Sequence, residues 1–267
     1  MSSTCPAKPN LMFQVAPTLG SEMIVLRVGL ERKEFTIHKA LACDSVKFFK
    51  AAFENGFAEA KDDIMELPED KPETISLLVD WIYRRTIPEG YTAAHVHTLF
   101  DLYVFADKIC EPILKDQIVD CIQDMGEYLG HVDILFTQEL FEKIKHIEMR
   151  GLKHFIITFM AYLFLLKGQA ELDIEEEEGV DKGSPLNFAF DNRKPVYEGG
   201  RLADWISKED LKIAWDALQG DFELFAHFQS LVFLGYRELE DPRHMRSIDR
   251  CFYHCHGKDE QCHYPRV

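Results

Sequence analysis

The stretch FTIHKALACDS places four side chains of catalytic type close together: His38, Cys43, Asp44 and Ser45. A nucleophilic serine or cysteine needs a base within hydrogen-bonding reach and a third group that orients the base. The surrounding pattern favours another interpretation, in which a strand ends at His38 and a helix begins near Ser45. Asp44 or Ser45 would then cap the helix, His38 would be a buried histidine bonded to backbone groups, and Cys43 would be a small core residue.

A second group of reactive side chains lies in the C-terminal stretch CFYHCHGKDEQCH. Zinc prefers thiolate and imidazole ligands, four of them in a tetrahedron. Cys251 with His254 or Cys255, together with Cys262 and His263, could supply four ligands, although the spacing matches no standard zinc module. The alternative is a tail whose side chains never converge. A zinc site is therefore a hypothesis, and the sequence indicates no other cofactor.

The absence of common catalytic motifs and the negative net charge exclude several classes of function. The chain contains no G-x-S-x-G, P-loop, G-x-G-x-x-G or H-E-x-x-H, so we expect no enzyme. The net charge of −16 over 267 residues disfavours direct nucleic-acid binding and binding to an anionic membrane. The longest apolar run, FIITFMAYLFLL, is shorter than the roughly 20 residues that span a bilayer and predicts a buried helix.

The expected compartment follows from the N-terminus and the cysteines. The first residues, MSSTCPAKPN, contain no apolar signal core, which argues against secretion. Seven cysteines, an odd number, do not suggest a disulfide framework in a chain of this length. We therefore expect a reducing compartment, the cytoplasm or the nucleus.

The elements that must position these residues begin with a β-hairpin. Apolar and β-branched residues predict strands at 23–28 and 34–38, with a charged turn between them. The period then changes to that of a helix, because Val46, Phe49 and Phe53 fall on one face. The strand–helix joint at the start of this helix holds the first group of reactive side chains.

A third strand is predicted at 64–67, and three helices follow it. Pro72 opens the first of them, since a proline at the first helical position loses no hydrogen bond. Thr92 is the expected N-cap of the second, and Pro112 begins the third. The sequence predicts no strand after these helices.

Beyond residue 126 the pattern is helical with one interruption. Apolar periodicity predicts helices near 140–147 and 152–163. An acidic stretch with prolines and glycines follows and indicates a linker or a long loop. A weak capping box at Ser207 and Asp210 begins a further helix, and the last helix starts at Asp221.

The N-terminal residues occur in an order typical of one family. A Phe in the second strand, a His-Lys pair at its end, and a Leu and a Ser that lead into a helix with a Phe pair resemble a BTB/POZ domain. The stretches GFAEA, IMELPED, LLVDWIY and LYVFADKI match further in register. The LPED and WIY variants are similar to the short BTB-only proteins common in filamentous fungi. The structural signature residues are Phe35, His38, Lys39, Leu41, Ser45, Phe48 and Phe49.

This resemblance implies an α+β fold, in which a small three-stranded sheet with a helical cluster is followed by an all-helical C-terminal region. No kelch repeats, zinc-finger array or channel segments follow the matched part. The expected division of the chain is a flexible N-terminal segment at 1–20, a BTB/POZ domain at 21–125, a helical region at 126–170, an acidic linker or loop at 171–200, a second helical region at 201–241 and a Cys/His-rich tail at 242–267.

The stretch FAE indicates a partner. BTB adaptors that engage the cullin scaffolds of ubiquitin ligases carry an apolar-x-Glu element in the corresponding loop. The resemblance thus implies that Phe57 fills an apolar pocket of a cullin and that Glu59 adds a polar contact. In the alternative, Phe57 packs back on its own domain and Glu59 is solvated.

We predict a non-enzymatic protein–protein interaction scaffold, with the role of substrate adaptor for a cullin-based ubiquitin ligase as its specific form. One alternative is a self-associating BTB protein of transcriptional regulation that binds no cullin. The family implies a homodimer, but Met23 stands near the position where many members carry an Asp at the dimer face. Another alternative is a zinc-binding protein, or a metal-dependent or thiol enzyme, that uses the tail.

Overall fold

The computed structural model describes residues 19–55, 57–90, 92–129, 138–162, 196–197, 200–201, 215–216, 218, 220, 222–234, 250–256 and 262–263. The predicted flexible N-terminal segment and the helix predicted after Ser207 lie almost wholly outside these residues. The chain divides into two compact units, which consist of residues 1–88, 101–118 and 255–267, and of residues 89–100 and 119–254. None of the described helices is long and apolar enough to cross a membrane.

A three-stranded sheet in the order β2-β1-β3 forms the centre of the first unit. β1 (Met23–Val28) pairs antiparallel with β2 (Lys33–His38) and parallel with β3 (Ile64–Leu67). Every second residue of β1 is fully buried, because side chains alternate between the two faces of a strand. The predicted hairpin and the predicted third strand are confirmed.

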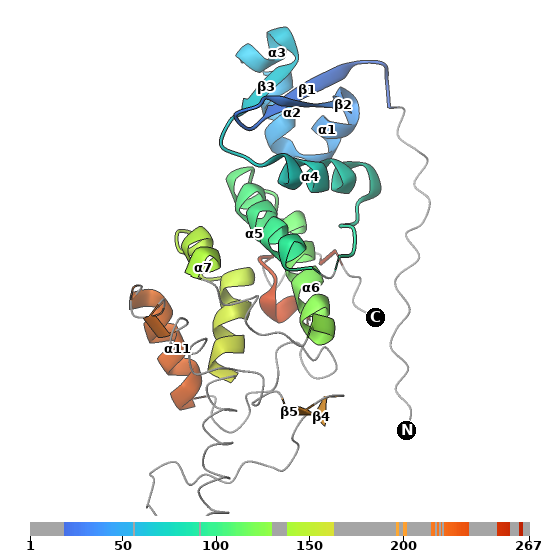
Figure 1. Ribbon diagram of the computed structural model, residues 1–267. Helices are drawn as coiled ribbons and strands as arrows, with labels where there is room; N and C mark the ends of the chain where they lie inside the picture. The colour runs from blue at the N-terminus through green and yellow to red at the C-terminus, as the bar shows by residue number, and fades with distance from the viewer. Residues whose placement is uncertain are drawn as a thin grey trace, which may run out of the picture. The chain divides into compact units, whose positions relative to one another are not determined.

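Four helices accompany this sheet, as the blue and teal parts of Figure 1 show. α1 contacts β2 and α4, and α2 contacts α1 and α3. The buried residues of α2 include Phe49 and Phe53, so the predicted inner face of this helix is confirmed. The helices are α1 (Lys39–Ser45), α2 (Lys47–Glu54), α3 (Ala58–Asp62) and α4 (Pro72–Arg84).

The prediction that Asp44 or Ser45 is a helix N-cap is wrong. α1 begins directly after β2, so Asp44 and Ser45 are its last two residues, and neither of them is the N-cap of α2. The backbone leaves the helical region at Val46, with φ −134° and ψ 115°, and Val46 is the N-cap of α2 without a side-chain hydrogen bond. Asp44 is exposed, and the buried hydroxyl of Ser45 has no partner among the described residues. The prediction failed because α1 lacks a strong start signal.

Two longer helices follow, α5 (Ala93–Lys108) and α6 (Pro112–Leu129). The hydroxyl of Thr92 accepts a hydrogen bond from the backbone N–H of His95 at 3.2 Å, which confirms the predicted N-cap. Tyr103 is fully buried on α5, as its spacing predicted. Pro112 begins α6, which confirms the predicted start of that helix.

The second unit contains α7 (Gln138–Ile144), a helix over residues 152–162 and α11 (Phe222–Leu234). The helix over 152–162 is buried on nearly all sides, as its apolar run predicted. A short antiparallel pair, β4 (Val196–Tyr197) and β5 (Gly200–Arg201), overlaps the predicted linker and the helical region after it. The expectation of a purely helical C-terminal region therefore missed one small hairpin, because two-residue strands carry no readable periodicity.

Candidate functional site

The strand–helix joint at residues 35–45 does not assemble a nucleophile and a base. The Nδ1 atom of His38 lies 2.7 Å from the hydroxyl oxygen of Tyr83, and that oxygen accepts the backbone N–H of His38 at 3.2 Å. The hydroxyl can in turn donate its proton to Nδ1. His38 is half-buried and its ring bonds a side chain instead of backbone groups, which corrects the prediction. Cys43 is buried, and this burial raises the pKa of its thiol.

Lys39 connects this joint to the loop before β3. Its Nζ lies 2.7 Å from Oδ1 of Asp63, and this hydrogen bond raises the pKa of the lysine. Asp63 follows α3 in the left-handed region, with φ 53°. Neither Tyr83 nor Asp63 was predicted as a partner, since no sequence spacing marks two residues that meet only in the folded unit.

The remaining signature residues divide into core and surface positions. Leu41 and Phe49 are buried, and Phe35 is half-buried with the Nζ of Lys33 5.3 Å from its ring centre. Phe48 packs edge-on against Phe49, with ring centres 5.9 Å apart, and remains partly exposed. Leu41 and Phe49 therefore belong to the core, whereas Phe35 and Phe48 lie toward the surface.

The FAE stretch forms the start of α3 and exposes its aromatic ring. Phe57 is the N-cap residue of α3, with an extended backbone, and 58% of its surface is exposed. Glu59 lies in the first turn of the same helix and is half-buried. The alternative in which Phe57 packs back on its own domain is therefore not what the structure shows. An exposed aromatic residue beside a carboxylate can act as an anchor for another protein.

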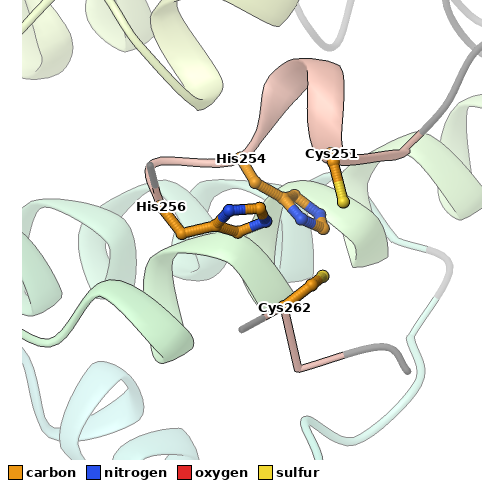
Figure 2. Close-up of side chains that lie close together, drawn as sticks. All are labelled: Cys251, His254, His256 and Cys262. Atoms are coloured by element: carbon orange, nitrogen blue, oxygen red, sulfur yellow. The ribbon is translucent and has the colours of Figure 1, made fainter. Parts of the chain in front are cut away.

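The tail brings four side chains of metal-binding type together, as Figure 2 shows. Each of Cys251, His254, His256 and Cys262 offers one ligand atom, and these atoms all lie within 4.8 Å of one another. His254 and Cys262 are buried, whereas Cys251 and His256 are half-buried. All four come from one short stretch of chain near the C-terminal end of the sequence.

A single helical turn positions the first two of these side chains. The 3-10 helix η2 (Arg250–Tyr253) has Cys251 in it, and the backbone N–H of His254 donates to the carbonyl of Cys251 at 3.3 Å. Residues three apart in a 3-10 helix lie on the same side. Tyr253 is fully buried and packs edge-on against Phe155, with ring centres 5.4 Å apart. This packing holds the turn in the second unit.

His254 is oriented by a buried carboxylate. Its side chain is 0% exposed, and its Nε2 lies 3.1 Å from Oδ1 of Asp120, whose side chain is 5% exposed. A carboxylate that accepts the N–H of one ring nitrogen leaves the other nitrogen oriented as a metal ligand. Asp120 belongs to α6, and no feature of the sequence singled it out as a partner of the tail.

Two of the predicted ligands have other neighbours. Oδ1 of Asp116 accepts the backbone N–H of Cys255 at 2.5 Å, and the Cys255 sulfur lies 3.5 Å from the hydroxyl of Tyr103. Burial raises the pKa of the Cys255 thiol. His263 offers a ring nitrogen within 4.8 Å of a carboxylate oxygen of Asp116 and of a ring nitrogen of His254, which form a separate group of three. The grouped set therefore contains His256 in place of Cys255 and His263.

The second unit also brings two half-buried histidines together. The ring centres of His154 and His227 lie 5.2 Å apart, and His154 also contacts Phe252 and Tyr253. Burial lowers the pKa of His154 to about 4, and the neighbouring His227 contributes to this lowering. Burial also lowers the pKa of His227. Both rings are thus held in the neutral form at physiological pH.

Comparison with known proteins identifies the N-terminal part. The family model of the BTB/POZ domain matches residues 24–124. The chain is similar to Kelch-like protein 30 from Homo sapiens, with 30% identity over 133 residues, which are 45% of this chain and 23% of that protein. The chain thus matches less than a quarter of the length of this relative. The sheet, the signature residues and these matches agree that residues 24–124 of the chain form a BTB/POZ domain, a protein-interaction module.

Proposed function

We propose that the chain is a non-enzymatic scaffold of the cytoplasm or the nucleus, which binds one protein through its BTB/POZ domain and another through its helical C-terminal region. A BTB/POZ domain is a protein-interaction module. At residues 35–45 His38 bonds the hydroxyl of Tyr83, whereas Cys43 and Ser45 are buried apart from it. The net charge of −16 fits partners that are proteins better than nucleic acid or an anionic membrane.

We further propose that the partner of the BTB/POZ domain is a cullin scaffold and that residues 126–241 recruit a substrate for ubiquitination. The observation that carries this proposal is the exposure of Phe57 at the start of α3, with Glu59 in the first turn of that helix. An aromatic side chain that is presented by a fixed helix start loses little conformational freedom when a partner buries it. The resemblance to BTB adaptors that carry an apolar-x-Glu element in this loop supports the proposal.

The test is a pull-down of the full-length chain with the N-terminal region of a cullin. A Phe57→Ala, Glu59→Ala double variant should lose about 10-fold or more in affinity, as truncation of an anchor residue does. Leu30→Ala is the matched control, because Leu30 is an apolar residue of the same unit that is 95% exposed in another turn. Absence of binding by the unmodified chain, or equal binding by the double variant, would contradict the adaptor role.

Self-association is the second candidate, and a small exposed apolar surface favours it. Met23 at the start of β1 is 36% exposed, and it lies opposite His38 in the sheet register. Tyr83, which bonds His38, is 41% exposed. If this surface joins two copies, Met23→Glu should convert a dimer to a monomer in light scattering after size exclusion. A monomeric unmodified chain would remove this candidate.

A further inference from the structure

We propose that Cys251, His254, His256 and Cys262 form a structural zinc site that holds the C-terminal segment in place. Nothing in the BTB/POZ domain requires such a site, so the inference is independent of the scaffold role. Two thiolates and two imidazoles are a preferred ligand set of zinc, and a set of four protein ligands is typical of structural sites. The soft sulfur ligands also disfavour magnesium and calcium, which prefer oxygen.

The distances between the ligand atoms fit this assignment. Zinc–sulfur bonds of about 2.3 Å and zinc–nitrogen bonds of about 2.0–2.1 Å place neighbouring atoms of a tetrahedron about 3.3–3.8 Å apart. The four side chains already bring these atoms within 4.8 Å of one another. Small side-chain movements of about 1 Å would therefore close the tetrahedron.

The charge of the site fits its burial. Two thiolates and a divalent cation sum to zero, so the occupied site is neutral although it contains an ion. Two of the four side chains, His254 and Cys262, are buried. A neutral cluster avoids the desolvation cost that an isolated buried ion would carry.

Asp120 acts as a positioning residue of the site. Its carboxylate accepts the Nε2–H of His254, with 3.1 Å between the heavy atoms. Zinc is then bound through Nδ1 of His254, the ring nitrogen on the other side. Such carboxylate–histidine pairs fix the tautomer and the orientation of a zinc ligand, and their loss costs about 10- to 100-fold in metal affinity.

Cys255 and His263 are not ligands in this assignment, although they belong to the same stretch. The sulfur of Cys255 lies 3.5 Å from the Tyr103 hydroxyl, and its backbone N–H is held by Asp116. Through these contacts Cys255 packs the segment, whereas its neighbours His254 and His256 bind the metal. The assignment therefore predicts that loss of Cys255 leaves zinc bound and that loss of His256 removes it.

The test measures zinc in the full-length chain, purified without chelator and reloaded with zinc sulfate, by mass spectrometry of the metal. We expect about one zinc per chain, as a site of this type retains its ion through purification. Cys251→Ser and Cys262→Ser should each lose the zinc, whereas Cys255→Ser and the exposed-site control Cys110→Ser should keep it. Zinc-free unmodified protein, zinc that survives in both serine variants at 251 and 262, or loss in Cys255→Ser would overturn the assignment.

Two further measurements separate ligands from residues that only support folding. Cobalt(II) bound to the unmodified chain should show a thiolate-to-metal charge-transfer band and the intense visible absorption of a tetrahedral site.

His256→Cys should retain zinc, because a thiolate replaces an imidazole ligand, whereas His256→Ala should lose it. Asp120→Asn should weaken zinc binding about 10- to 100-fold without changing the cobalt spectrum at saturation. Octahedral cobalt without the sulfur band, or equal zinc affinity in His256→Ala, would reject the site.

Discussion

Two short stretches of this chain, residues 35–45 and residues 251–263, are rich in histidine and cysteine. The side chains of the first stretch lie apart, whereas several of the second lie close together. At the strand–helix joint, His38 bonds the hydroxyl of Tyr83 while Cys43 is buried in the core. In the tail, the ligand-type atoms of Cys251 and His254 lie within 4.8 Å of those of His256 and Cys262. A strand followed by a helix separates its side chains, whereas a 3-10 turn places residues three apart on one side.

The comparison also shows how the partner of a histidine determines its chemistry. The neutral hydroxyl of Tyr83 orients His38 without adding charge. The buried carboxylate of Asp120 orients the ring of His254 through a hydrogen bond to its Nε2. Residue types and spacing alone therefore do not distinguish a structural histidine from a metal-binding one.

The largest expected effect is the loss of thermal stability when zinc is removed. This loss should depend on the cysteines of the tail and not on Cys43. Stripping zinc with a strong chelator should lower the Tm of the full-length chain by several degrees, because binding free energy of a structural zinc contributes to folding. When chelator is added to Cys43→Ser, its Tm should fall by the same amount, because Cys43 lies outside the site. The Tm of Cys262→Ser should not change on adding chelator, because that variant holds no zinc to lose. The measurement is differential scanning calorimetry with and without chelator. An unchanged Tm of the unmodified chain would contradict a stabilising zinc site in the tail.

Acid should weaken the second unit through His154, which packs against the η2 turn. The pKa of His154 is about 4 in the folded chain, against an ordinary value of 6.5 for a solvated histidine, so the unfolded chain binds more protons between these values. Stability should be complete above about pH 6.5 and should fall as the pH is lowered to about 4, by on the order of 3 kcal/mol.

Urea unfolding at pH 7 and pH 5 measures this loss. His154→Gln should reduce the difference between the two pH values, whereas His146→Gln, which replaces an exposed histidine, should leave it unchanged. An identical pH dependence in His154→Gln would show that another group is responsible.

The smallest expected effect concerns the joint itself. Tyr83→Phe removes the hydroxyl that bonds both the ring and the backbone N–H of His38. It should lower the free energy of unfolding by about 1 kcal/mol, since Tyr83 is partly exposed and water can replace the hydroxyl. Zinc content should stay the same. A change in zinc content would mean that the two stretches are not independent.

Much of the BTB/POZ domain could be predicted because its signals are local. The alternation in β1, the proline at the start of α4 and the cap at Thr92 act through neighbouring residues. The exposed loop at Phe57 was found in the same way, from three adjacent residues and the family resemblance. α1 and the true position of Ser45 at its end were missed because no local signal marks them.

The sequence by itself determined which residues were available for chemistry, where most of the N-terminal elements begin, and that the tail is rich in metal-binding types. Only the tertiary structure decided that His38 meets Tyr83, that Lys39 meets Asp63 and that His254 meets Asp120. Each of these pairs joins residues far apart in the chain. Such contacts depend on the packing of whole helices and strands, and no spacing within one element encodes them.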